Sequence, residues 1–159
     1  MGFIKPIEQY LFCNLLTKMH VFMYLKDIIR GREEMTKNII IKTSVQKRFD
    51  SFMMHGRVLF FSAPCGFGKT VLADALLRGR NVLRQSAADP DCAIPPSAQD
   101  WDILLIDDLQ FMQEEAGQQA LCELIRSSPE RHFVLLSRGV PPGCLTAFQY
   151  TGLMTVLEA

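Results

Sequence analysis

The clearest chemical signal in the sequence is a short glycine-rich segment that ends in a lysine and a threonine. Gly66, Gly68, Lys69 and Thr70 match the last part of the phosphate-binding pattern GxxxxGK[ST], with Ala63 where the pattern has its first glycine. Glycines let backbone N–H groups turn toward an anion, and a helix that begins there adds partial positive charge. We therefore expect Lys69 to reach the β- and γ-phosphates of a nucleotide and the Thr70 hydroxyl to ligate Mg²⁺.

This segment predicts a phosphate-binding loop (P-loop, or Walker A loop), because an apolar run of strand length precedes it and a helical stretch follows it. A glycine-rich turn that merely connects a strand to a helix is the alternative, and the Gly-Lys-Thr string argues strongly against it. The residues expected to contact the nucleotide are Pro64, Cys65, Gly66, Phe67, Gly68, Lys69, Thr70 and Val71.

Two acidic residues follow a second apolar run and can complete such a site. The run at 103–106 is followed directly by Asp107 and Asp108. We expect Asp107 to hold Mg²⁺ together with Thr70, directly or through water, and Asp108 to act as a catalytic residue that orients or deprotonates the attacking water. Alone, this pattern is a weak signal, because strands often end in polar turns. Its pairing with the Gly-Lys-Thr string makes it a candidate metal and water site.

A third candidate is Arg138, which follows the apolar run at 132–137. In open α/β sheets, ligands bind outside the carboxyl ends of the strands. Arg138 is therefore expected to sense the γ-phosphate as a second catalytic residue. A surface arginine that precedes the turn at Pro141 and Pro142 is an alternative of nearly equal weight.

Apolar runs of strand length alternate with helical stretches over most of the chain, which is typical of a parallel sheet buried on both faces. We predict an α/β fold, the core of a P-loop nucleoside triphosphatase, with a sheet of about four to five strands covered by helices on both faces. The expected strands are 58–62, 81–85, 102–107, 132–137 and 152–157, the expected helices are 45–54, 71–80 and 114–127, and the proline-rich segment 86–100 is expected to be a loop.

Composition excludes several other classes of protein. The chain has 159 residues, 48% of them apolar, with 17 basic and 17 acidic side chains, so neither global disorder nor a strong basic field for nucleic acid is expected. Its five cysteines form no CxxC motif, which favours reduced thiols in a cytoplasmic protein. Polar and charged residues interrupt the apolar stretch 11–29, so neither a membrane span nor a secretory signal is predicted.

The pattern divides the chain near residue 34. Residues 1–34 are predicted to be a helical appendage, dense in apolar residues, that ends at a Gly-Arg-Glu-Glu break. Residues 35–159 are predicted to form the ATP-binding domain. Residues 35–57 are mainly basic and 86–130 mainly acidic, an asymmetry that ordinary solvated faces of one globule explain best.

The motifs together resemble those of one protein family. Residues 62–72 are similar to the APxGxGKTxL loop of MalT-type regulators, which are large LuxR-family transcription activators of the STAND class of signal-transduction ATPases. An alanine is usual in that loop in place of the first glycine. Residues 104–108 resemble the family's second nucleotide motif, and residues 136–145 resemble its SRxxPPxxL sensor segment. The resemblance covers roughly residues 58–157.

This resemblance implies an ATP-binding switch that changes conformation, multimerises and activates transcription. Such regulators also carry a winged helix, helical repeats and a DNA-binding module, none of which fits after Leu157. We therefore expect a truncated core, without lid, repeat or DNA-binding module, that binds ATP or ADP with Mg²⁺ and hydrolyses ATP slowly or not at all. Its expected partner is a protein or a second copy, bound through the missing modules, and neither DNA nor a membrane.

Two other functions stay open. A AAA+ replication ATPase of the initiator or helicase-loader kind is the main alternative, because residues 104–111, Leu-Leu-Ile-Asp-Asp-Leu-Gln-Phe, closely resemble the initiator motif. The loop at 63–66 and the Ser-Arg-Gly string at 137–139 do not resemble that family. A degenerate P-loop domain that serves only as an interaction module is the second alternative, and the intact Gly-Lys-Thr string argues against it.

Overall fold

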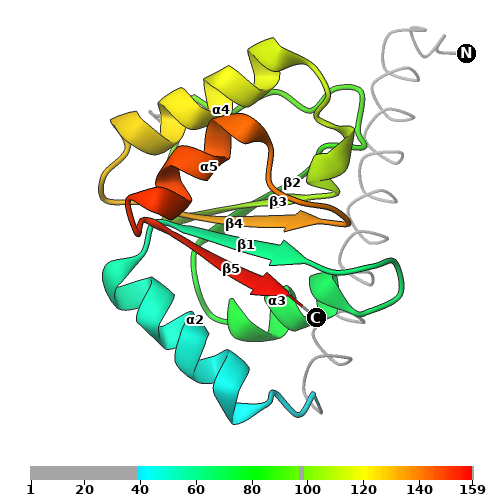
Figure 1. The fold of residues 1–159 in the computed structure, drawn as a ribbon, viewed down its shortest axis with the longest axis vertical. Coiled ribbons are helices and arrows are strands. Elements are labelled where there is room, and N and C mark those ends of the chain that lie inside the picture. Colours follow the sequence, from blue (N-terminus) through cyan, green and yellow to red (C-terminus); the bar gives the residue numbers. More distant parts are fainter. Residues whose placement is uncertain (1–38, 97–98, 159) are drawn as a thin grey trace, which may run out of the picture. The chain divides into compact units, whose positions relative to one another are not determined.

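A parallel sheet of five strands lies at the centre of the described part of the chain (Figure 1). The strands lie in the order β2-β3-β4-β1-β5, and every neighbouring pair is parallel. The side chains of β1, β3 and β4 are almost all buried, as expected for strands covered on both faces. The strands are β1 (Val58–Ser62), β2 (Val82–Ser86), β3 (Ile103–Asp107), β4 (His132–Ser137) and β5 (Met154–Glu158).

The computed structural model describes residues 39–96 and 99–158. The chain divides into two units, and residues 40–159 are the unit that holds the sheet. The helical appendage predicted for residues 1–34 lies outside the described residues. Every site residue predicted from the sequence lies inside them.

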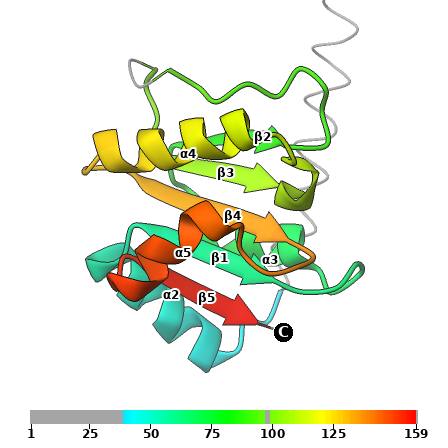
Figure 2. The same cartoon turned by 45° about the horizontal axis from the view of Figure 1, so that its top comes forward.

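Helices cover both faces of the sheet (Figures 1 and 2). On one face lie α2 (Thr43–His55) and α3 (Lys69–Leu76), and on the other lie α4 (Glu115–Ser127) and α5 (Gly143–Tyr150). A single 3-10 turn, η1 (Leu109–Phe111), connects the end of β3 to the segment that leads into α4.

Alternation along the strands sends neighbouring side chains to opposite faces. On β1, Phe60 packs in the apolar cluster beneath α4 and α5, whereas Leu59 packs in the cluster beneath α2 and α3. The helices contribute Leu121, Ile125, Leu145 and Phe148 to the first cluster and Phe49, Phe52, Ala73 and Leu76 to the second. Burying one Leu or Phe side chain contributes about 1.5–3 kcal/mol, so these two clusters supply most of the stabilising free energy.

The predicted α/β fold is confirmed, and so is the loop that follows β2. The predicted boundaries agree with the structure to within two residues, except at the end of one helix. The helix expected at 71–80 is α3, which begins at Lys69 and ends at Leu76. The strand expected at 152–157 is β5, which begins at Met154, because Gly152 has a left-handed φ of 75° and belongs to the preceding turn.

The helix α5 is absent from the sequence prediction. It begins directly after Pro142, which occupies its N-cap position. Leu145 and Phe148 are the buried residues of this helix. Eight residues with two buried positions are too few to show a helical period in the sequence, so the segment was identifiable only by what it packs against.

Arg57 joins the start of β1 to the end of α4. Its guanidinium donates hydrogen bonds to the carbonyl oxygens of Ile125 (2.7 Å), Ser128 and Arg131 (3.1 Å). The last carbonyl groups of a helix have no partner within the helix and carry partial negative charge. The cation therefore satisfies the end of α4 and holds that helix over the sheet.

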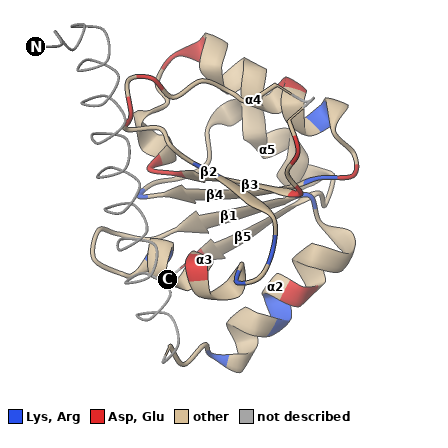
Figure 3. Cartoon of the chain, turned by 180° about the vertical axis from the view of Figure 1, so that it is seen from behind, with Lys and Arg blue, Asp and Glu red and all other residues tan. Residues whose placement is uncertain are grey.

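The surface carries charges of both signs. On α2, the basic residues Lys47 and Arg48 lie close in sequence to Asp50. Figure 3 shows residues of both charges on this helix, so it does not present a face of one sign. In the described part of the chain, none of the helices has the length and apolar character needed to cross a membrane.

His132, at the start of β4, makes the stability of the fold depend on pH. Its ring lies edge-on to Phe52, with ring centroids 5.3 Å apart. Burial, assisted by the positive charges of Arg57 and Arg80, lowers the pKa of His132 below its ordinary 6.5. The unfolded chain therefore binds the proton first, so the free energy of unfolding falls as the pH drops below about 6.5, until His132 is protonated in the fold as well.

We expect His132→Phe to reduce this loss of stability at low pH, because the substitution removes the group that is neutral in the fold and charged in the unfolded chain. Urea unfolding at two pH values, one above 7 and one below 6, measures it in the parent and the variant. His55→Phe is the control, since His55 is exposed on α2. An unchanged pH dependence in His132→Phe would contradict the assignment.

Candidate functional site

The loop between β1 and α3 has the backbone of a phosphate cradle. Gly66 has a φ of 84° and Gly68 a φ of 72°, left-handed values that glycine adopts at little cost. A Cβ added to either glycine would meet no atom within 4 Å, so the space beside the loop is open and the backbone conformation alone requires glycine. Gly68 is the N-cap residue of α3, which brings the unpaired amides of the first helical turn to the loop.

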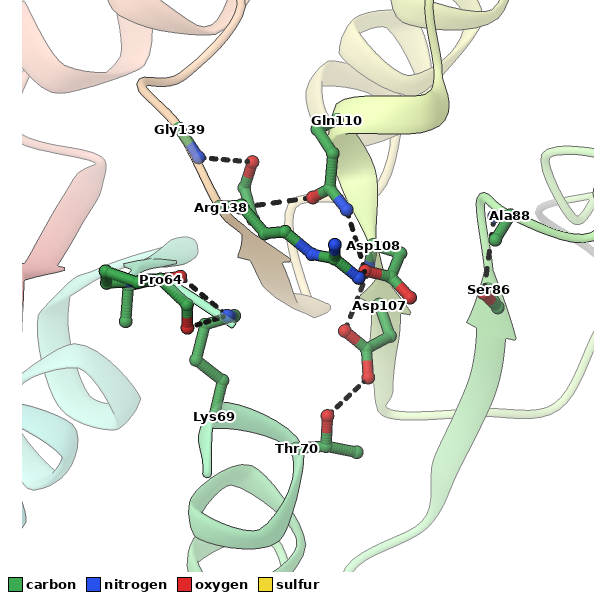
Figure 4. Close-up of polar contacts among 12 residues, drawn as sticks. Pro64, Lys69, Thr70, Ser86, Ala88, Asp107, Asp108, Gln110, Arg138 and Gly139 are labelled. Carbon is green, nitrogen blue, oxygen red and sulfur yellow. Dashed lines mark hydrogen bonds and ion pairs between the residues drawn. The ribbon is translucent and has the colours of Figure 1, made fainter. Parts of the chain in front are cut away.

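Lys69, the first residue of α3, folds back over this loop (Figure 4). Its ammonium group donates hydrogen bonds to the carbonyl oxygens of Ala63 (2.6 Å) and Pro64 (3.0 Å). Ala63 is held in turn at the end of β4, because its N–H donates to the Ser137 carbonyl (3.2 Å). The positive charge predicted to bind phosphate therefore lies on the loop, in hydrogen bonds to neutral carbonyl oxygens that an anionic phosphate oxygen can replace with stronger ones.

Thr70 and Asp107, the two predicted metal ligands, are in direct contact. The Thr70 hydroxyl donates a hydrogen bond of 2.6 Å to Asp107 Oδ2, although the two residues are 37 positions apart. The other carboxylate oxygen, Oδ1, accepts the backbone N–H of Asp108 at 2.7 Å. The pair lies between the start of α3 and the end of β3, as Figure 4 shows.

These two residues fit a magnesium ion that a nucleotide helps to hold. Mg²⁺ takes oxygen ligands in octahedral geometry and is usually bound through one or two carboxylates together with substrate phosphates and water. The Thr70 hydroxyl and the Asp107 carboxylate are such oxygens, and both side chains are half-buried beside the phosphate loop.

The two predicted catalytic residues, Asp108 and Arg138, also contact each other, with Arg138 Nη2 3.2 Å from Asp108 Oδ1. The carboxylate is 31% exposed and the guanidinium 46% exposed, so this ion pair contributes little to stability. The ion pair instead orients the two side chains. The pair fixes where the carboxylate and the guanidinium lie at the carboxyl edge of the sheet.

Gln110 is a site residue that the sequence prediction omits. Its amide nitrogen donates to Asp108 Oδ1 (2.7 Å), and its amide oxygen accepts the backbone N–H of Arg138 (3.1 Å). The only signal in the sequence is its place in the Asp-Asp-Leu-Gln string. A glutamine in a polar turn has many possible partners, so that signal does not specify a role.

The remaining predicted nucleotide contacts are spread along the loop and the first turn of α3. Cys65 and Phe67 are exposed on the loop, Phe67 by 63%, and Val71 is 38% exposed on α3. Pro64 contributes its carbonyl oxygen to Lys69. The structure thus brings Lys69 into contact with its loop, while Cys65 and Val71 make no contact that defines a role.

A pocket of about 340 Å³ adjoins the phosphate loop on the side of α2 and β5. Its walls are mostly apolar and also carry basic side chains and the acidic Glu158. The residues that line it are Lys42, Ser44, Val45, Arg48, Phe61, Ser62, Ala63, Phe67, Lys69, Leu72, Leu157 and Glu158. Arg48 donates a hydrogen bond of 2.5 Å to the Val156 carbonyl, which ties α2 to β5 beside the pocket. The contribution of α2 has no signal in the sequence, because it depends on how α2 packs.

Solved structures match the fold of this chain, whereas its sequence has no match. Neither a protein-family model nor a curated protein matches the sequence. A solved structure of a DNA replication initiation factor matches with a TM-score of 0.55 and 19% identity, over 77% of this chain and 49% of that one. Domain III of the Thermotoga maritima replication initiation protein DnaA matches with a TM-score of 0.54 and 18% identity, over 77% of this chain and 66% of that one.

At this level of identity the matches establish the fold. The chain spans about half the length of the first protein and two thirds of the second. The described unit therefore has the α/β fold of P-loop nucleoside triphosphatases.

The left-handed backbone at Gly68 leads to a prediction about stability. We expect Gly68→Ala to lower the free energy of unfolding by about 1 kcal/mol, because a left-handed φ is unfavourable for a residue with a Cβ even where space is open. Gly143→Ala is the control, since Gly143 also has open space around it and no positive φ. Chemical denaturation measures both, and equal effects would show that backbone strain does not require glycine at position 68.

Proposed function

We propose that this chain is an ATP-binding module of the AAA+ replication-initiator kind. The observation that carries the proposal is the contact between Thr70 and Asp107 beside the loop that holds Lys69. Two further points support it: the fold is shared with two replication initiation proteins, and residues 104–111 resemble the initiator motif.

The nucleotide would lie along the carboxyl edge of the sheet. Its base would fill the pocket beside the loop, against the apolar side chains of Val45, Phe67 and Leu157. Its phosphates would lie on the glycine-rich loop, where Lys69 exchanges its two carbonyl partners for phosphate oxygens. Bound Mg²⁺ would neutralise phosphate charge and orient the γ-phosphoryl group, held on the protein side by Thr70 and Asp107.

Asp108 and Arg138 would act on the γ-phosphate side of the site. The Asp108 carboxylate would orient or deprotonate the attacking water, and the Arg138 guanidinium would contact the γ-phosphate. We expect hydrolysis by the isolated chain to be far slower than the median enzyme rate of about 10 s⁻¹. An arginine supplied by a neighbouring subunit is worth about 10³–10⁵ in rate in related chemistry, so a protein partner or a second copy of the chain would accelerate it.

The ATP-dependent switch of a MalT-type transcription regulator is the second candidate. The Ala-Pro-Cys-Gly loop and the Ser-Arg string followed by two prolines favour it. Both candidates use the same nucleotide site. The initiator kind has more support, because both solved structures described above are named as replication initiation proteins, and because the glutamine of the Asp-Asp-Leu-Gln string makes two hydrogen bonds in this site.

One outcome of the following experiment would separate the two candidates. Hydrolysis of ATP is measured with and without single-stranded DNA, and DNA retention is measured by fluorescence anisotropy at physiological salt. We propose that the segment alone retains no DNA, since basic and acidic residues are mixed on α2 and the two phenylalanines of this helix, Phe49 and Phe52, are buried, whereas a single-strand platform exposes its aromatic side chains. ATP hydrolysis on the scale of seconds that single-stranded DNA stimulates would contradict the expected lack of DNA binding. It would also exclude the MalT-type regulator as the function.

Lys69→Ala should abolish binding of both ATP and ADP while the fold is kept, because the hydrogen bonds of the Lys69 ammonium group go to two loop carbonyl oxygens. We expect a loss of at least tenfold in affinity, about 1.4 kcal/mol, by titration calorimetry with Mg²⁺ present. Lys47→Ala is the matched control, since Lys47 is exposed on α2. A Lys69→Ala variant that binds ATP within about threefold of the parent would refute the phosphate cradle.

Substitution of the two aspartates should have different effects. Asp107→Asn removes the charge next to Thr70, so Mg²⁺-dependent ATP binding should weaken while binding without Mg²⁺ changes little. Asp108→Asn should keep binding and lower only the slow hydrolysis. Titrations with and without Mg²⁺, together with phosphate release, measure both effects. Equal losses of Mg²⁺-dependent binding would contradict this division of roles.

A further inference from the structure

The backbone of Asp108 turns the chain sharply at the end of β3. Its φ of 54° is the one positive value at a non-glycine residue in the described part of the chain. In this conformation Asp108 donates its own N–H to Asp107 Oδ1 and occupies the N-cap position of η1. A left-handed backbone is unfavourable for an aspartate, so neighbouring contacts must hold it. The turn brings Gln110 back beside the Asp108 side chain.

Gln110 uses both ends of its amide to join two strand ends. The amide nitrogen donates to Asp108 Oδ1, at the end of β3, and the amide oxygen accepts the backbone N–H of Arg138, directly after β4. Figure 4 shows the glutamine between these two partners. The side chain therefore spans the gap between the two strand ends and ties η1 to both.

Both donors that reach the Asp108 carboxylate use the same oxygen. Gln110 Nε2 lies 2.7 Å and Arg138 Nη2 lies 3.2 Å from Oδ1, whereas Oδ2 accepts no hydrogen bond from the described residues. These two donors therefore leave Oδ2 unused, and the Asp108 side chain is 31% exposed to solvent. Because Gln110 also holds the Arg138 backbone, one side chain sets the position of the carboxylate and of the arginine together.

We propose that Gln110 is a positioning residue that couples Asp108 to Arg138 and thereby lets the site distinguish ATP from ADP. The proposal rests on the proposed ATP-binding function. ADP lacks the γ-phosphate, so the position of Arg138 affects its binding little. ATP gains a contact with Arg138 only where the guanidinium is held at the end of β4, and Gln110 helps to hold it there.

The chemistry of the side chain explains why glutamine is required. Only a group with a donor and an acceptor at this length makes both hydrogen bonds. Methionine has a similar length and makes neither. Glutamate keeps the acceptor for the Arg138 N–H, but it cannot donate when ionised and places a second negative charge against Asp108.

The test compares the affinities of ADP and of a non-hydrolysed β,γ-imido analogue of ATP, both with Mg²⁺, by displacement of a fluorescent nucleotide. For Gln110→Met we expect the affinity for the analogue to fall about tenfold and that for ADP to stay within about twofold. Gln110→Glu should lose at least as much preference for the analogue. Gln119→Met is the matched control, because Gln119 is exposed on α4 and bonds only Glu115; its preference should match that of the parent. Thermal unfolding of each variant is recorded alongside.

The outcomes separate this inference from the function on which it rests. If the parent binds nucleotide and Gln110→Met keeps the parent's preference, the proposed role of Gln110 is wrong and the ATP-binding function stands. Equal losses for both nucleotides, together with a lowered melting temperature, would show a merely structural role and also overturn it. If the parent binds neither nucleotide, the ATP-binding function and this inference both fall.

Discussion

The site depends on one constraint, the parallel direction of β1, β4 and β3, which are neighbours in the sheet. Parallel strands end at the same edge, so the segments that follow them must emerge side by side. The phosphate loop follows β1, Asp108 follows β3 and Arg138 follows β4. The apolar side chains on both faces of these strands hold the arrangement, because alternate residues pack in the two different clusters and a strand out of register would exchange them.

At that edge the polar side chains satisfy one another. Thr70 bonds Asp107, Lys69 bonds two loop carbonyls, and Arg138 bonds Asp108. Half-buried polar groups without partners are unfavourable, so these contacts lower the cost of keeping a charged site on a folded edge. The phosphates of a nucleotide with bound Mg²⁺ can replace these contacts with stronger ones. The same side chains therefore stabilise the site and would bind the nucleotide.

The helices on the α4 face take part in the site through their connections. η1 carries Gln110 and leads into α4, while the segment that carries Arg138 leads into α5. Arg57 anchors the far end of α4 at the start of β1. The position of Gln110 is therefore limited at both sides, by its hydrogen bonds at the strand ends and by the packing of the helix that follows.

The sequence by itself determined the local chemistry: the Gly-Lys-Thr loop after an apolar strand, the acidic pair after another, and the α/β class with its buried strands. These signals lie in consecutive residues, where backbone preference and hydrophobic pattern act directly. Only the tertiary structure decided the order of the strands, the contact between Thr70 and Asp107, the bridge made by Gln110, the helix α5 and the pocket wall from α2. Each of these joins residues far apart in the chain, or orients a directional hydrogen bond. These contacts and orientations depend on which apolar faces are buried together, and a local sequence pattern does not specify that.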